Sequence, residues 1–258
     1  MADVQLFLST VSNEFRSYRD ELRRQLKRPN VDVHVQEDFI STGTETLDKL
    51  DSYIASCDAV IHLVGDMTGA WAPVDVSRSL HSRYANLAES LPPLAPSFET
   101  GTPPLSYTQW EAYLAIHHGK RLVIALPEPG ALRDPNYRAE KEQQASQQAH
   151  LERLRLLGRY PDFTFGNVDQ LAARVLRSSI LDLLADADRK QSAHERDRKQ
   201  PNLGLILLLL LLAAVFSWAA YSLVTERFFF FLYATLSFAF SVAAVVRVRH
   251  YLRQKLGG

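Results

Sequence analysis

The sequence predicts an α/β protein with a mainly parallel sheet that carries helices on both faces, followed by an apolar helical hairpin. Three observations support this prediction. Short apolar runs alternate with stretches of helical period through residues 1–185. The run AVIHLVG at 59–65 is almost entirely apolar, which is typical of a strand buried on both faces. Two runs without a charged residue, 203–224 and 228–246, lie towards the C-terminal end.

Residues 4–28 predict the first strand and the first helix. The run VQLFLS at 4–9 is rich in residues that favour β-structure. Apolar residues then recur at helical spacing over 13–28, with Ser12 as the N-cap and Pro29 beyond the last turn. Together these segments form one β-α unit.

Residues 31–65 predict two further strands with a helix between them. Valines alternate with polar residues over 31–35, which indicates a half-exposed strand near an edge of the sheet. A loop that contains Gly43 follows over 37–44. Apolar residues at helical spacing over 47–57 predict a helix, and the apolar run at 59–65 predicts a central strand.

A proline-rich stretch at 66–105 interrupts the alternation. It contains six prolines and fits no single regular element, so we interpret it as an insertion or lid. Ser106 begins the next helix, because Gln109 is placed as its reciprocal capping partner, and Gly119 ends that helix. The run RLVIAL at 121–126 predicts a strand.

The remaining part of the soluble region predicts a helix, a strand and a last helix. A polar, Gln-rich helix is expected over 137–157, with its first half solvated, and FTF at 163–165 predicts a short final strand. Apolar residues at helical spacing over 168–184 predict an amphipathic helix. The charged segment 186–200 either extends that helix or serves as a juxtamembrane linker. One domain over 1–185 is therefore expected.

The C-terminal region 201–249 predicts a transmembrane helical hairpin. Its two apolar runs, 203–224 and 228–246, each approach the about twenty residues that an α-helix needs to cross a bilayer. The connector 225–227 is so short that the helices must run antiparallel. Basic residues flank the outer ends and continue through the tail 250–258, which predicts that both termini are cytoplasmic and that the lipid bilayer is a partner. Small residues in both runs permit close helix contact and self-association: Ala213, Ser217, Ala220, Ala234, Ser237 and Ser241.

Composition excludes several functional classes. The formal net charge is zero and no cluster of basic and aromatic residues occurs, so no nucleic-acid partner is expected. Cys57 is the single cysteine, which excludes an intrachain disulfide and a cysteine-based zinc site. The chain has no Walker loop, dinucleotide glycine fingerprint or nucleophile elbow, and no spacing of metal ligands, so we expect no metal site and no bound cofactor.

Candidate site residues follow from the predicted parallel sheet. Ligands of such sheets bind outside the carboxyl ends of the strands. The residues just beyond the predicted strands, or at the start of the helix after the insertion, form a largely polar set with one aromatic residue and several carboxylates: Ser9, Thr10, Glu37, Asp38, Gly65, Asp66, Trp110 and Glu111. The sequence therefore predicts a polar site at this edge.

Several motifs together resemble a bacterial TIR (Toll/interleukin-1 receptor) domain. They are the opening VQLFLST, the run from Asp38 through Gly43 to AVIHLVG, and YTQWEAYLA followed by GKRLVIAL. The resemblance covers roughly residues 3–185 and implies a flavodoxin-like, five-stranded parallel sheet. It also implies that the loop 37–44 serves self-association and covers the substrate. The chain departs from the family pattern where Gly65 replaces a serine and where Trp110 immediately precedes Glu111.

The resemblance implies cleavage of NAD as a substrate, with Glu111 as the catalytic glutamate. Breaking the nicotinamide–ribose bond develops positive charge on the sugar, and a carboxylate beside the ribose can stabilise it. Ser9, Thr10 and Asp38 are candidates to hold ribose or phosphate oxygens, and Trp110 or Trp71 to stack on a ring. The structural alternatives are a first-turn acid for Glu111, a core residue for Trp110 and a loop cap for Asp38.

Two functions remain open at this point. The first is a membrane-anchored NAD-cleaving effector of the bacterial inner membrane, an NAD nucleosidase that oligomerises to become active in antiphage defence. Its product is linear or cyclic ADP-ribose. The second is a non-catalytic, TIR-like sensor or scaffold whose hairpin localises to the membrane or disrupts it.

Overall fold

The computed structural model describes residues 4–35, 45–101, 104–138, 140–199, 203–222 and 227–256. The chain divides into two compact units, Met1–Arg189 and Lys190–Gly258, and each is described by itself.

The first unit is built on a parallel sheet. Its strands in the described residues are β1 (Val4–Ser9), β2 (Val31–Val35), β3 (Ala59–Leu63), β4 (Arg121–Pro127) and β5 (Phe163–Phe165). Their order is β2-β1-β3-β4-β5, and every neighbouring pair is parallel. The α/β class and the five-stranded parallel sheet are thus confirmed, with β2 at an edge and β3 at the centre. The strand order changes direction between β1 and β3, which is where ligands bind in open sheets of this kind.

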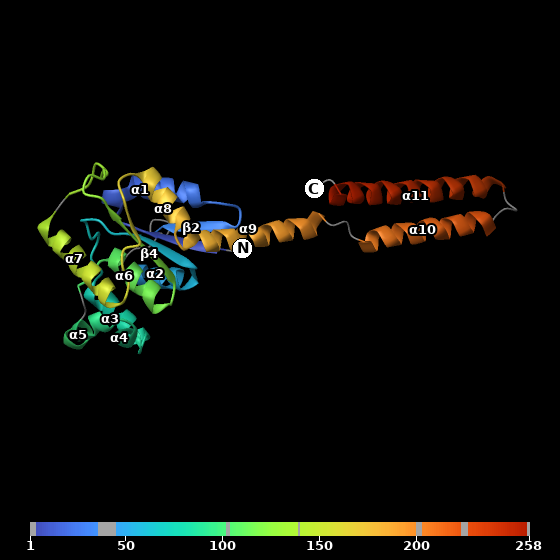
Figure 1. Ribbon diagram of the computed structural model, residues 1–258. Coiled ribbons are helices and arrows are strands. Elements are labelled where there is room, and N and C mark those ends of the chain that lie inside the picture. The colour runs from blue at the N-terminus through green and yellow to red at the C-terminus, as the bar shows by residue number, and fades with distance from the viewer. Residues whose placement is uncertain are drawn as a thin grey trace. The chain divides into compact units, whose positions relative to one another are not determined.

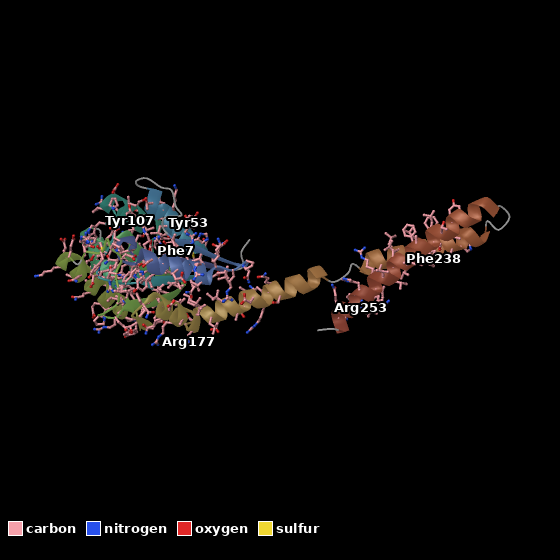
Figure 2. The ribbon with its side chains drawn as sticks, turned by 90° about the horizontal axis from the view of Figure 1, so that it is seen from above. Phe7, Tyr53, Tyr107, Arg177, Phe238 and Arg253 are labelled. Carbon is pink, nitrogen blue, oxygen red and sulfur yellow. The ribbon has the colours of Figure 1, made fainter. Side chains whose placement is uncertain are left out.

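Helices cover both faces of the sheet (Figure 1). Helices α1 (Ser12–Leu26), α8 (Val168–Arg177) and the first part of α9 (Ile180–Lys199) pack on one face with the inner residues of β1 and β3, such as Leu6 and Ile61. Helices α2 (Glu45–Ser56), α6 (Tyr107–His117) and α7 (Lys141–Leu156) cover the other face, where Phe7 and Val60 point. Phe7 lies deep among the side chains of this unit (Figure 2).

Helix α6 is the buried centre of the second layer. It begins with the predicted capping box, in which Ser106 Oγ accepts from Gln109 N at 3.2 Å and Gln109 Oε1 accepts from Ser106 N at 3.2 Å. Its residues from Thr108 to Ala115 are all buried. The helix is covered on all sides because α2 and the helices of 74–100 pack around it. Such a position fixes its side chains firmly relative to the sheet.

The proline-rich stretch contains several short helices. They are α3 (Val74–Arg83), α4 (Leu87–Ser90), the 3-10 turn η2 (Pro92–Leu94) and α5 (Ala95–Thr100). Their apolar residues, including Leu80, Leu87 and Leu94, join the core that surrounds α6. Four of the prolines, Pro73, Pro92, Pro93 and Pro96, stand at or just before the start of a helix, where the missing N–H costs little.

Three helix boundaries differ from the predicted ones. Helix α1 begins at Ser12 itself, whose hydroxyl accepts from the Arg19 guanidinium at 2.7 Å instead of capping the helix. Helix α7 begins at Lys141 and not at 137. Tyr137 instead packs towards the turn after β3, where its hydroxyl donates to Asp66 at 2.6 Å. The last helix breaks at Ser178 into α8 and α9, and α9 extends through the charged segment.

The second unit contains two long helices. They are α10 (Leu203–Ser222) and α11 (Arg227–Leu256), which lie side by side and run antiparallel (Figure 1). Ser237 Oγ donates to the Ala213 carbonyl at 3.1 Å, and the rings of Phe216 and Phe240 stack with centroids 5.7 Å apart. Small residues therefore do lie at the contact between these helices, whereas Phe238, labelled in Figure 2, is 72% exposed.

The predicted location is contradicted. In the parts of the chain that the structure describes, no helix has both the length and the apolarity needed to cross a bilayer. The expectation of a two-pass protein of the bacterial inner membrane with cytoplasmic ends is therefore corrected. The expectation rested on the lengths of the uncharged runs 203–224 and 228–246 and on the basic residues that flank them, whereas α11 continues through Arg247 and Arg249 to Leu256.

Candidate functional site

A cavity lies at the carboxyl end of β1. Its volume is about 190 Å³, and three segments line it: the start of α1 after β1, the turn after β3 and the first turn of α6. The lining residues are Thr10, Val11, Ser12, Asn13, Gly69, Ala70, Tyr107 and Thr108. The cavity therefore stands at the predicted edge of the sheet, beside the point where the strand order changes direction.

Thr10 is the predicted site residue that lines this cavity. Its side chain is 7% exposed, and its hydroxyl oxygen is buried with no hydrogen-bond partner among the described residues. A buried hydroxyl without a partner is unfavourable by about 1–3 kcal/mol. Ser9, one residue earlier, is also buried, but its hydroxyl is 2.6 Å from His62 Nδ1.

Glu111 lies on α6 close to the cavity but does not line it. It is 1% exposed and follows Thr108 and Tyr107 by three and four residues, which places all three on one side of the helix. The Tyr107 hydroxyl interacts with Thr46 in the first turn of α2, so this side of α6 faces α2. Glu111 is thus one turn of α6 away from the two residues of this helix that line the cavity.

Gly65 makes room for a carboxylate of the protein itself. A Cβ atom at this position would overlap the carboxylate of Glu14. Glu14 is fully buried in the first turn of α1 and accepts hydrogen bonds from Asp66 N at 3.1 Å, Met67 N at 2.8 Å and Arg133 Nε at 2.7 Å. At Gly65 the chain just after β3 therefore approaches α1 closely.

Sequence reasoning missed Glu14 and Arg133. Glu14 resembles any acid in the first turn of a helix, and Arg133 lies 119 positions further on, so no local pattern joins them. Arg133 also places its guanidinium over the rings of Phe15 and Tyr137, with 4.9 Å and 5.6 Å to the centroids. Through these contacts of Arg133, the segment after β4 is held against the residues that follow the carboxyl ends of β1 and β3.

The two tryptophans predicted to stack on a ligand ring, Trp110 and Trp71, have different environments. Trp110 is fully buried, donates from Nε1 to Ser77 Oγ at 3.2 Å and packs against Phe98 and Tyr113, so it is a core residue. Trp71 is 44% exposed and pairs with Ser106 through an isolated bridge. Asp38 lies outside the described residues.

A chain of buried polar side chains extends from Ser9 into the core. His62 Nε2 is 3.1 Å from His150 Nε2, and His150 Nδ1 is 2.9 Å from the Tyr113 hydroxyl. Burial lowers the pKa of His62 to about 3, lowers the pKa of His150 well below its ordinary value and raises the pKa of Tyr113 to about 12. Both histidines are therefore neutral at pH 7. The signal in the sequence is His62 itself, because a histidine within an apolar strand needs polar partners.

The first half of α7 is less solvated than expected. Gln147 is 3% exposed and donates to the Met67 carbonyl at 2.8 Å, and it accepts from Gln109 Nε2 at 3.1 Å. No group of three or more His, Cys, Asp or Glu side chains suited to a metal ion occurs among the described residues.

The solved structures to which this chain is similar include one of low similarity. No protein-family model and no curated protein matches the chain. The 2-desoxiribosyltransferase from Leishmania mexicana is 16% identical in sequence, and the match covers 50% of this chain and 67% of that chain with a TM-score of 0.31. A likeness at this level supports no conclusion about activity.

Proposed function

We propose that this chain is a TIR-like enzyme that cleaves NAD at the bond between nicotinamide and ribose, with Glu111 as the catalytic carboxylate. The observation that carries the proposal is the position of Glu111 on α6, one turn from Tyr107 and Thr108. Those two residues line the cavity at the carboxyl edge of the parallel sheet, where ligands of such sheets bind.

The chemistry of this cleavage suits a buried carboxylate. As the bond breaks, its electron pair leaves with nicotinamide and positive charge develops on the ribose. A carboxylate in surroundings of low dielectric stabilises that charge more strongly than it would in water. Water then adds to the ribose and loses a proton, which gives ADP-ribose. Attack by an adenine nitrogen in place of water would give a cyclic product from the same site.

The cavity accommodates one part of the dinucleotide. Sites for small ligands usually enclose about 300–1,000 Å³, and this cavity encloses about 190 Å³. Thr10 and Thr108 offer hydroxyls to an oxygen-rich group such as ribose or phosphate. Catalysis also requires Glu111 to become accessible from its 1% exposed position, so we expect the site to open when substrate binds.

A second candidate function is a non-catalytic scaffold that recruits a partner through the TIR-like domain. The burial of Glu111 favours it, because a carboxylate enclosed in a helix that is buried on all sides can serve packing alone. Under this function the loss of Glu111 would change stability but no activity.

The two functions are separated by incubating the purified full chain with NAD and measuring nicotinamide and ADP-ribose by chromatography. The chain is assayed both dilute and cross-linked into oligomers. Release of nicotinamide that Glu111→Gln lowers by about 100-fold or more supports the enzyme. Absence of release from the wild-type chain in both states would support the scaffold instead.

A further inference from the structure

The N-terminal ends of two helices meet at the cavity beyond β1. Residues 11–13 at the start of α1 line it together with Tyr107 and Thr108 at the start of α6. Gly69, in the turn after β3, lies between the two ends, because a Cβ atom there would be 3.3 Å from Thr108 Oγ1 and 3.4 Å from Val11 Cγ2. The first turns of α1 and α6 are therefore close neighbours at this cavity.

Each of these helix ends presents a backbone amide that donates to no acceptor among the described residues. At the start of α1, the Val11 carbonyl accepts from the amides three and four positions on, and the Asn13 amide between them makes no such bond. At the start of α6, Ser106 accepts from the amides three and four positions on, and the Thr108 amide is likewise open. Amides in the first turn point out of the N-terminal end of a helix. Both open amides thus belong to residues that line the cavity.

A buried hydroxyl without a partner lies at the same cavity. Thr10, which lines it, is 7% exposed, and its Oγ1 has no hydrogen-bond partner in the described part of the chain. This hydroxyl belongs to a side chain outside both helices, so it is an observation independent of the two open amides. Buried polar groups in native proteins are nearly always hydrogen-bonded. The Thr10 hydroxyl therefore points to a ligand that supplies its partner.

These donors match a phosphate group better than a ribose. Backbone amides only donate, whereas every ribose hydroxyl also needs an acceptor for its own proton. Each helix N-terminus carries roughly +0.5 elementary charge, which attracts an anion and gives a neutral sugar little. Among the described residues that line the cavity, none has a carboxylate that would repel an anion. Phosphate oxygens can accept from the two amides and from the Thr10 hydroxyl together.

We propose that this cavity is a phosphate-binding site, in which the amides of Asn13 and Thr108 and the hydroxyl of Thr10 donate to phosphate oxygens. The phosphate is either part of a nucleotide or free inorganic phosphate. Its assignment to a phosphate of the dinucleotide rests on the proposed NAD-cleaving function. In that assignment the cavity anchors the substrate by its phosphate and leaves the ribose outside.

The first test follows the two amides directly. The full chain is labelled with ²H and ¹⁵N, and amide spectra are recorded while inorganic phosphate, ADP-ribose or adenosine is added at constant ionic strength. We expect phosphate and ADP-ribose to move the amide protons of Asn13 and Thr108 downfield along one binding curve for each ligand. Adenosine, which has no phosphate, should leave both unmoved. Movement with adenosine, or no movement with either phosphate compound, would overturn the proposal.

The second test removes the Thr10 hydroxyl and keeps the shape of its side chain. Thr10→Val is expected to weaken the binding of inorganic phosphate about ten-fold, because a hydrogen bond to a charged group is lost. The midpoint of urea unfolding without phosphate should stay equal or rise, because this hydroxyl has no partner among the described residues to lose. Wild-type affinity in Thr10→Val would overturn the proposal.

Thr164→Val is the matched control. It makes the same substitution at an exposed hydroxyl that donates to Glu128 Oε1 at 3.3 Å and does not line the cavity. Its affinity for inorganic phosphate should equal that of the wild type. An equal loss of affinity in the two variants would refute a specific role of Thr10.

The release of nicotinamide from NAD separates this inference from the proposed function. Amide shifts with phosphate and ADP-ribose, without release of nicotinamide, would support the phosphate site and refute only the enzyme. Shifts with inorganic phosphate alone would support the site and refute the dinucleotide as its source. Release of nicotinamide without any shift of the two amides would refute the phosphate site and leave the enzyme standing.

Discussion

Glu14 shows how one buried carboxylate joins segments that are distant in the sequence. Its three donors are two backbone amides after β3 and the guanidinium of Arg133, which is itself 14% exposed. A buried ion pair adds little when complete, but removal of one partner leaves the other charge uncompensated. The pair therefore fixes the segment after β4 in place more than it adds stability.

Glu14→Gln is expected to lower the free energy of unfolding by about 3 kcal/mol, because Arg133 would keep its charge without a counter-ion. Unfolding in urea measures this change. Glu152→Gln is the matched control, because Glu152 pairs with Arg155 at the exposed surface. This substitution should lower the free energy of unfolding by less than about 1 kcal/mol. Equal losses in the two variants would show that Glu14 carries no buried pair.

Gly65→Ala tests the close approach between β3 and α1. The added Cβ overlaps the Glu14 carboxylate and forces it from its amide donors, so we expect a loss of about 1–3 kcal/mol. Gly130→Ala is the control, because a Cβ at Gly130 meets no atom within 4 Å. Thermal unfolding of both variants is the measurement, and a Gly65 variant as stable as the Gly130 variant would contradict the geometry.

At the scale of elements, the contact between β3 and α7 makes stability depend on pH. Burial depresses the pKa of His62 to about 3 and that of His150 in the same direction, while an unfolded histidine titrates near 6.5. Between these values the unfolded chain binds more protons than the folded one. The stabilisation is therefore complete above about pH 6.5 and is lost as the pH falls towards about 3.

The expected slope is about 1.4 kcal/mol per pH unit for each histidine within that window. Urea unfolding at pH 7, 6, 5 and 4 measures it, and the proton uptake on unfolding at pH 5 gives an independent value. Stability that stays level from pH 6.5 to pH 4.5 would mean that the two rings are protonated in the fold.

The sequence predicts elements well where local chemistry determines them. The apolar run at 59–65 gave β3, and the Ser106–Gln109 pair gave the start of α6, because strand burial and capping are local properties. The predicted helix boundaries were wrong where contacts with distant residues determine them. Helix α7 starts late because Tyr137 binds Asp66, and its first half is partly buried because Gln147 binds Met67.

At the scale of the whole molecule, topology explains which site residues the sequence could identify. Parallel strands place their carboxyl ends at one edge, so Thr10 was predictable as a residue of the cavity. The Glu14–Arg133 pair and the His62–His150 pair are contacts between elements far apart in the sequence. A single sequence does not indicate which residue is the partner of which. The predicted location was wrong because it was inferred from two uncharged runs and their basic flanks, whereas no described helix has the length and apolarity needed to cross a bilayer.

The central claim is that Glu111 serves catalysis at the edge of the sheet, and its most direct test is the rate of nicotinamide release from NAD. The purified full chain is compared with Glu111→Gln and with the surface control Glu152→Gln at several protein concentrations. We predict release by the wild type and the control, and a rate at least about 100-fold lower in Glu111→Gln. Equal rates in the wild type and folded Glu111→Gln, or no release from any of the three, would contradict the account.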